Sequence, residues 1–94
     1  MNGERLFVKI CGITRPQDAE LASGLGAAAL GFVFWPDSPR YLAHEAASRI
    51  ARRVPPSVLK VGVFVDEDLD KIRGIMDAVG LDVAQLHGRE TPED

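Results

Sequence analysis

The chain has 94 residues, a formal net charge of −3 and a hydrophobic content of 46%, which together indicate one small globular domain or part of a larger one and exclude a disordered chain. No basic cluster exceeds Arg52-Arg53, so the sequence carries no electrostatic footprint for nucleic acid, and no stretch has the length of a signal peptide or a membrane span. The single cysteine excludes an internal disulfide and a cysteine-based zinc site, and it suits a reducing cytoplasm.

The first predicted element is an apolar run at residues 7–11 that ends at Gly12. Its near-continuous apolar character is typical of a strand that is covered on both faces of a parallel sheet. Because side chains alternate along a strand, Lys9 and Cys11 share one face, and Cys11 comes at the carboxyl end, where parallel α/β folds bind ligands. This pair predicts a functional site, although a lone cysteine is more often an inert buried residue.

A helix is predicted next, because Thr14 can serve as its N-cap and Pro16 lies in its first turn. Gly26 is predicted to end it in a left-handed conformation. The apolar stripe of this helix is expected to consist of Ala19, Leu21, Ala22 and Leu25. An apolar second strand follows at residues 28–34, and then a loop at residues 35–41 whose length is typical of functional loops.

The same alternation continues along the chain. Residues 44–53 predict a second helix with a poor N-cap at Ala43, and residues 58–65 predict a third strand. A third helix begins after the acidic residues 66–68 and ends at Gly80. The buried positions predicted for these two helices are Ala47, Ile50, Ala51, Val54, Leu69, Ile72, Met76 and Val79.

The last predicted strand covers residues 83–87 and turns at Gly88; it places Gln85 and His87 on one face. Thr91 then has the features of a helix N-cap. The order of elements implies parallel strands joined by helices, and it fits either an open doubly wound sheet or part of a (β/α)8 barrel. The inward-facing Lys9 and Gln85 favour the barrel, and a complete barrel needs about 250 residues.

Four motifs resemble, in the correct order, the phosphoribosylanthranilate isomerase family of tryptophan biosynthesis. They are KICGIT at residues 9–14, GFVF with SPRY at residues 31–41, VGVFV at residues 61–65 and QLHG at residues 85–88. The family is a (β/α)8 barrel of about twice this length. The resemblance therefore implies that residues 1–94 are the N-terminal half of such a barrel: an α/β fold with strands one to four, three helices and the start of a fourth.

The resemblance implies an Amadori rearrangement of N-(5-phosphoribosyl)anthranilate to 1-(2-carboxyphenylamino)-1-deoxyribulose 5-phosphate. This reaction is an aldose–ketose isomerisation of the intramolecular oxidoreductase type. The resemblance implies neither a cofactor nor a metal. Cys11 is implied as the base, and a thiol with an ordinary pKa of about 8.5 needs only a modest decrease to act near neutral pH. Arg40 is expected to bind the anthranilate carboxylate through its guanidinium fork. His87, Lys9 and Gln85 are expected to bind substrate, although His87 and Gln85 also suit purely structural roles.

In this family the general acid is an aspartate on a later strand, and the phosphate lies on loops after the last two strands. We therefore expect residues 1–94 alone to be inactive. Two open sheet edges predict self-association or pairing with a C-terminal half-barrel, and a non-catalytic half-barrel is the main alternative function. A flavodoxin-like or receiver-like domain is disfavoured because residues 12–15 provide neither a phosphate-binding glycine loop nor an acidic cluster, and a redox role lacks a second cysteine.

Overall fold

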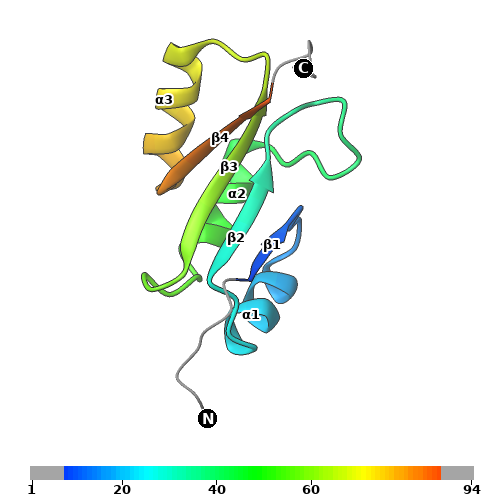
Figure 1. The fold of residues 1–94 in the computed structure, drawn as a ribbon, viewed down its shortest axis with the longest axis vertical. Coiled ribbons are helices and arrows are strands. Elements are labelled where there is room, and N and C mark those ends of the chain that lie inside the picture. Colours follow the sequence, from blue (N-terminus) through cyan, green and yellow to red (C-terminus); the bar gives the residue numbers. More distant parts are fainter. Residues whose placement is uncertain (1–7, 88–94) are drawn as a thin grey trace.

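The computed structural model describes residues 8–87, which form one parallel sheet with helices between its strands (Figure 1). The elements are β1 (Lys9–Cys11), α1 (Pro16–Gly24), β2 (Ala29–Val33), α2 (His44–Ala51), β3 (Leu59–Val65), α3 (Leu69–Val79) and β4 (Val83–His87). The predicted βα alternation is confirmed, and the boundaries of the elements differ from the predicted ones by at most two residues. The predictions for Phe7, Gly88 and the helix start at Thr91 lie outside the described residues.

The strand order β1-β2-β3-β4 decides between the two architectures that the sequence left open. Each strand is added on the same side of the one before it, and all three pairs are parallel. A doubly wound sheet would reverse its direction of growth at a switch point, whereas a barrel grows in one direction. Because right-handed crossovers then place every helix on one face, the fold is that of half a (β/α)8 barrel.

The main hydrophobic core lies between the sheet and its helices. Leu30, Phe32 and Phe64 are fully buried on the helix-facing side, where they belong to one cluster with residues of α2 and α3. The predicted buried positions Ala47, Ile50, Ala51, Val54, Ile72 and Val79 are confirmed, and Met76 packs against the cluster. Leu69 is 60% exposed, so this prediction is wrong: it is the first residue of α3 and precedes the part of the helix that packs on the core.

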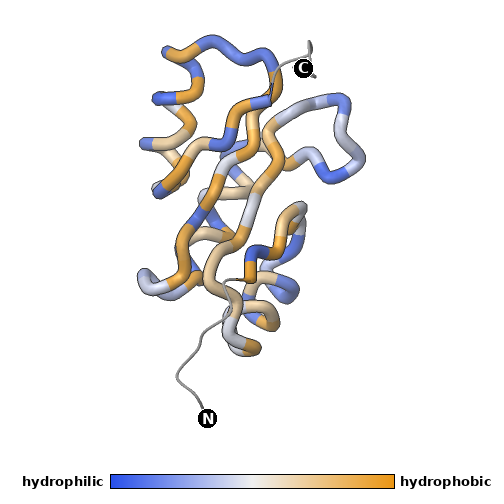
Figure 2. Tube along the Cα trace, in the orientation of Figure 1, coloured by the Kyte–Doolittle hydropathy of each residue, from blue (hydrophilic) through white to orange (hydrophobic). Residues whose placement is uncertain are grey.

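The prediction that the first strand is covered on both faces is wrong. All three residues of β1 are exposed, and Ile10 is exposed by 39%. β1 is an edge strand that pairs only with β2 within the described residues, so nothing there covers its free side. Figure 2 shows hydrophobic segments reaching into both edge strands, β1 and β4. The first strand is therefore apolar in composition but exposed at the edge of the sheet formed by residues 8–87.

Helix α1 departs from its predicted pattern for the same reason. Ala19 is buried, but Leu21 and Leu25 are exposed by 62% and 78% because α1 contacts the rest of the structure along a narrow strip. Its N-cap is Arg15, without a side-chain cap, and not Thr14 as predicted. Gly26 has the predicted left-handed backbone, with a φ of 97°.

Helix α3 is capped at both ends by residues that are its neighbours in the sequence. The carboxylate of Asp68 accepts a hydrogen bond from the backbone N–H of Asp70 at 3.0 Å, and Gly80 adopts a φ of 83° at the C-terminal end. Helix α2 begins at His44, and its N-cap, Ala43, provides no side-chain cap in the described part of the chain, as predicted. Within residues 8–87, none of the helices has the length and apolarity that crossing a bilayer requires.

Candidate active site

Cys11 ends β1 on the face of the sheet that the helices leave uncovered. Its sulfur lies over Gly31, the partner residue on β2, and a Cβ atom on Gly31 would come within 2.9 Å of that sulfur. Only glycine therefore leaves room for the thiol in this position. The thiol is free and exposed, so it is accessible to a small molecule at the carboxyl end of the strand.

Arg40 is brought to the same strand end by the loop between β2 and α2. The hydroxyl of Ser38 accepts a hydrogen bond from the backbone N–H of Arg40 at 3.0 Å, and a parallel bridge joins Tyr41 to Val33. These contacts hold the loop beside the carboxyl end of β2. They confirm the prediction that this segment is a loop, and they fix the point from which the Arg40 side chain extends.

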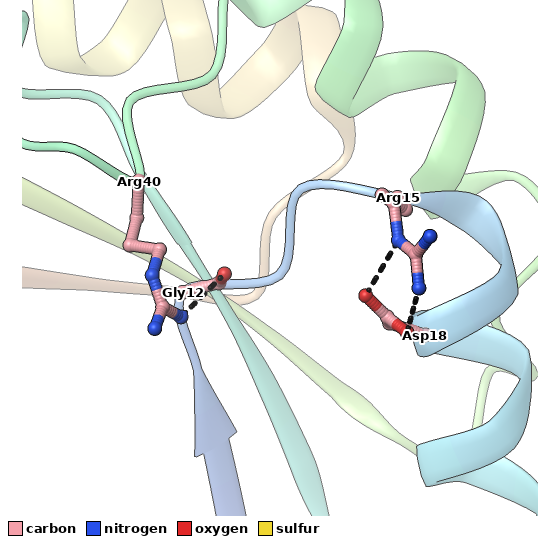
Figure 3. A network of polar contacts seen from close by, with 4 residues as sticks. All are labelled: Gly12, Arg15, Asp18 and Arg40. Carbon is pink, nitrogen blue, oxygen red and sulfur yellow. Dashed lines mark hydrogen bonds and ion pairs between the residues drawn. The ribbon is translucent and has the colours of Figure 1, made fainter.

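The guanidinium of Arg40 lies across Gly12, the residue that follows Cys11 (Figure 3). Its Nη1 atom donates to the carbonyl oxygen of Gly12 at 3.5 Å, and a Cβ atom on Gly12 would lie 3.1 Å from this nitrogen. Gly12 also has a φ of 87°, which favours glycine. The chain therefore places the Arg40 cation against Gly12, the residue that follows the thiol-bearing Cys11 at the end of β1.

A cavity of about 510 Å³ opens beside this strand end. Cys11, Gly12 and Arg40 line one part of it. Most of the remaining lining is apolar and comes from β1, from α1 and from the turns that flank them: Val8, Ile10, Ile13, Leu21, Ala22, Leu25 and Ala27. Because Ile10 and Cys11 point to opposite faces of the strand, the apolar part of this cavity lies outside the barrel face, and only its edge belongs to the candidate active site.

The other three predicted residues form a separate polar row on the inward face of the sheet. The ammonium of Lys9 donates to Oε1 of Gln85 at 2.5 Å, and Nε2 of Gln85 lies 3.1 Å from Nε2 of His87. The structure thus groups Cys11 with Arg40, and Lys9 with Gln85 and His87. Within residues 8–87, no hydrogen bond connects the two groups.

The bond between Lys9 and Gln85 shows that the sheet is curved. These residues lie on β1 and β4, which would be at least about 14 Å apart in a flat sheet, because neighbouring strands are about 4.8 Å apart. A direct contact between their side chains requires the sheet to bend toward the face that carries them. The concave face therefore corresponds to the interior of a barrel, and its carboxyl-end rim carries Cys11 and His87.

Comparison with known proteins identifies the family of this chain. The sequence profile of N-(5′-phosphoribosyl)anthranilate (PRA) isomerase matches residues 8–94. The chain belongs to the PRA isomerase family. It aligns with the N-terminal part of the family's proteins.

Individual PRA isomerases support this assignment. The protein from Geobacter sp. is 56% identical over 85 residues, which cover 90% of this chain and 42% of the relative. The crystal structure from Thermotoga maritima matches with a TM-score of 0.88 and 48% identity, covering 95% of this chain and 43% of that one. A further PRA isomerase, with the same TM-score and identity over 95% of this chain and 46% of that one, was solved with reduced 1-(o-carboxyphenylamino)-1-deoxyribulose 5-phosphate. The chain therefore spans less than half the length of these relatives.

Two glycines at this candidate site were not assigned a role from the sequence. Gly12 makes the close approach of Arg40 to the backbone feasible, and Gly31 makes room for the Cys11 sulfur. Gly31 had a usable signal, because a glycine inside an otherwise apolar strand often marks a close approach. Among residues 8–87, no group of three or more histidine, cysteine, aspartate or glutamate side chains is arranged to hold a metal ion.

Asp18 lines the cavity from α1 and is held by a neighbouring cation. Arg15 donates two hydrogen bonds to the Asp18 carboxylate, at 3.0 and 3.1 Å (Figure 3). These bonds keep the pKa of Asp18 below its ordinary value, and they raise the pKa of Arg15. Because the folded-state pKa is lowered, the associated stabilisation is present above the unfolded pKa of aspartate and is lost as the pH falls through the folded value.

We expect Arg15→Gln to raise the pKa of Asp18 toward that of a free aspartate, because the substitution removes the hydrogen bonds that favour the carboxylate. The measurement is an NMR pH titration of the Asp18 carboxyl carbon. Arg73→Gln is the matched control, since Arg73 forms a long exposed pair with Asp70 at 3.9 Å and does not touch Asp18. An Asp18 midpoint that stays unchanged in Arg15→Gln would contradict the assigned cause.

Proposed function

We propose that this chain supplies the base and the carboxylate anchor of a PRA isomerase that converts N-(5-phosphoribosyl)anthranilate to 1-(2-carboxyphenylamino)-1-deoxyribulose 5-phosphate. The main support is the position of Arg40 against Gly12, the residue next to Cys11, at the carboxyl end of β1, where Arg40 and Cys11 line the same cavity. A substrate with an anthranilate carboxylate on Arg40 would bring its sugar carbons toward the thiol. The complex of a relative with a reduced form of this product supports the same substrate class.

The reaction needs one acid and one base. Protonation of the furanose ring oxygen breaks its bond to C1′ and gives an iminium, and the Cys11 thiolate then removes the proton from C2′ to form an enolamine. Tautomerisation delivers a proton to C1′ and leaves a ketone at C2′. The sugar is thus reduced at C1′ and oxidised at C2′, which makes the isomerisation an internal oxidation–reduction. By family resemblance, the acid and the phosphate-binding loops belong to later strands of the barrel.

We infer that the partner of this chain is the C-terminal half of a PRA isomerase barrel. Three observations support this occupant: the apolar cavity at β1 and α1, the exposed edge strands β1 and β4, and the coverage of only 42% of the relative from Geobacter sp.. Exposed Val8, Ile10, Leu21 and Leu25 give this surface an apolar character that a second layer of barrel elements would bury. A non-catalytic half-barrel that pairs with its own copies is the second candidate, favoured by the same exposed edges.

Complementation distinguishes these two functions. Residues 1–94 are joined to the remaining C-terminal sequence of the Geobacter sp. relative, and isomerisation is followed by the loss of substrate fluorescence. We expect turnover by the chimera and none by the 94-residue chain alone. A chimera that folds as a monomer but is inactive would contradict the proposed function. A 94-residue chain that forms a stable homodimer and does not bind the separate C-terminal half would favour the second candidate.

We expect Arg40→Lys in this chimera to raise KM about 10-fold or more, because an ammonium cannot bind a carboxylate in the bidentate manner of a guanidinium. Arg52→Lys is the control, since Arg52 follows α2 and does not line the cavity. Steady-state kinetics with varied substrate separate KM from kcat. An unchanged KM in Arg40→Lys would remove Arg40 from substrate binding.

We also propose a cytoplasmic location. The support is the exposed thiol of Cys11, which the reaction needs in its reduced form and which a reducing compartment preserves. Expression of the full-length protein as a fluorescent fusion in its host tests this proposal directly.

A further inference from the structure

Lys9, Gln85 and His87 form a polar row on the concave face. In this row, each residue determines whether the next one donates or accepts a hydrogen bond. Lys9 is a donor only, because its ammonium has no lone pair. The atom of Gln85 that faces it at 2.5 Å must therefore be the amide oxygen. This fixes the orientation of the Gln85 amide and leaves its NH₂ group facing His87.

The same reasoning continues one residue further. The Gln85 NH₂ group only donates, so Nε2 of His87, which lies 3.1 Å from it, must accept. A neutral imidazole that accepts at Nε2 carries its proton on Nδ1. In water an imidazole side chain ordinarily favours the other tautomer, so the row selects a form that His87 would not otherwise prefer.

The strand positions beside Gln85 offer its side-chain amide few other hydrogen-bond partners. Gln85 lies opposite Val63 in the sheet register, and Val63 is buried and apolar. Val33 follows in the same row on β2. Gln85 is half-buried, and the hydrogen-bond partners of its side chain among residues 8–87 are Lys9 and His87. The Gln85 amide therefore lies next to apolar side chains, and it contacts the ammonium of Lys9 on one side and the imidazole of His87 on the other.

We propose that Lys9 and Gln85 are positioning residues that hold His87 as the Nδ1–H tautomer, so that His87 presents a hydrogen-bond donor at the rim of the barrel. The use of that donor by a sugar or carboxylate oxygen of the substrate rests on the proposed function, whereas the tautomer rests on the two hydrogen bonds alone. In this proposal, Lys9 and Gln85 act by fixing the tautomer of His87. They do not make the direct contact with the substrate that the sequence predicted.

The test is a long-range ¹H–¹⁵N NMR spectrum of the ¹⁵N-labelled 94-residue chain in alkaline buffer, where imidazoles are neutral. The pattern of ring-nitrogen shifts distinguishes the two tautomers. We expect His87 to be mainly Nδ1–H. His44 serves as an internal reference, because its ring faces Glu45 and lies outside the row. A wild-type spectrum in which His87 is mainly Nε2–H would overturn the proposal.

Two substitutions make the test specific. Gln85→Glu keeps the shape and the contact with Lys9 but offers His87 only acceptor oxygens, so we expect the population of His87 to shift from Nδ1–H to Nε2–H. Lys9→Met frees the amide to rotate, so we expect the Nδ1–H preference to be lost. Lys71→Met is the control for loss of one positive charge, since Lys71 lies on α3 and pairs with Glu67. If Gln85→Glu leaves the tautomer unchanged while the backbone spectrum shows an intact fold, the proposal is wrong.

Activity gives a second, separable readout. In the chimera with the C-terminal half, we expect Gln85→Glu to lower kcat/KM and Lys71→Met to leave it unchanged. If the wild-type chimera is inactive but the NMR result holds, the proposed function fails and the tautomer assignment stands. If the chimera is active and the wild-type tautomer is Nε2–H, the positioning role fails and the proposed function stands.

Discussion

Replacing Cys11 by alanine is expected to lower kcat/KM of the chimera by about 10²-fold to 10⁴-fold, the range that a general base contributes. The substitution removes the group that is proposed to take the C2′ proton, while Arg40, the proposed substrate anchor, stays in place. We therefore expect kcat to fall and KM to change little. Steady-state kinetics and a substrate-binding measurement on the same variant separate the two effects.

Matched variants show whether the loss comes from the chemistry of the thiol. Cys11→Ser preserves the shape but not the acidity of the group, so it should be nearly as inactive as Cys11→Ala. Ser23→Ala is the control, because the Ser23 hydroxyl is buried with no hydrogen-bond partner among residues 8–87 and does not line the cavity beside Cys11. A Cys11→Ala chimera with the full rate would show that the base is a different residue.

Replacing Phe64 by alanine is expected to reduce the free energy of unfolding by about 3–5 kcal/mol, the usual cost of removing a buried phenylalanine. Phe64 is 1% exposed, and its ring stacks on Phe34 with a centroid distance of 5.3 Å. Small domains are stable by only about 5–15 kcal/mol. The loss therefore removes a large share of the stability of residues 1–94, and urea denaturation followed by circular dichroism measures it.

The control for this prediction is Leu86→Ala on the neighbouring strand. Leu86 is also a large apolar residue, but it is 57% exposed, so its truncation should change the stability by less than about 0.5 kcal/mol. Equal effects of the two substitutions would show that the sheet does not pack against its helices as described. Joining the C-terminal half should increase the effect of Leu86→Ala if the β4 edge becomes buried in the complete barrel.

The sequence predicted best where local chemistry decides the outcome. The apolar runs of β2 and β3, the buried face of α2, most of the buried face of α3, the left-handed Gly26 and the helix end at Gly80 were correct, whereas Leu69 of α3 was not. Each depends on residues within one or two turns of chain. The N-cap predicted for α1 was wrong, because Thr14 is a suitable residue by type but the N-cap is one residue later, at Arg15, and the helix begins at Pro16.

The burial of β1 could not be predicted from its composition alone. An apolar strand is compatible with two covered faces, and only the strand order shows that β1 is an edge within the described residues. Leu21 and Leu25 of α1 are exposed for the same reason. Their hydrophobicity is consistent with a partner surface, which is the basis of the proposed docking of a C-terminal half.

By itself, the sequence determined the order of the elements, their parallel arrangement and the strand ends that carry Cys11 and His87, because alternation and helical periodicity are properties of neighbouring residues. Only the tertiary structure decided which of these side chains meet. The curvature of the sheet brings Lys9 to Gln85 across four strands, and the loop after β2 brings Arg40 to Gly12. Such contacts depend on how strands bend and pack in space, and no local pattern of residues encodes them.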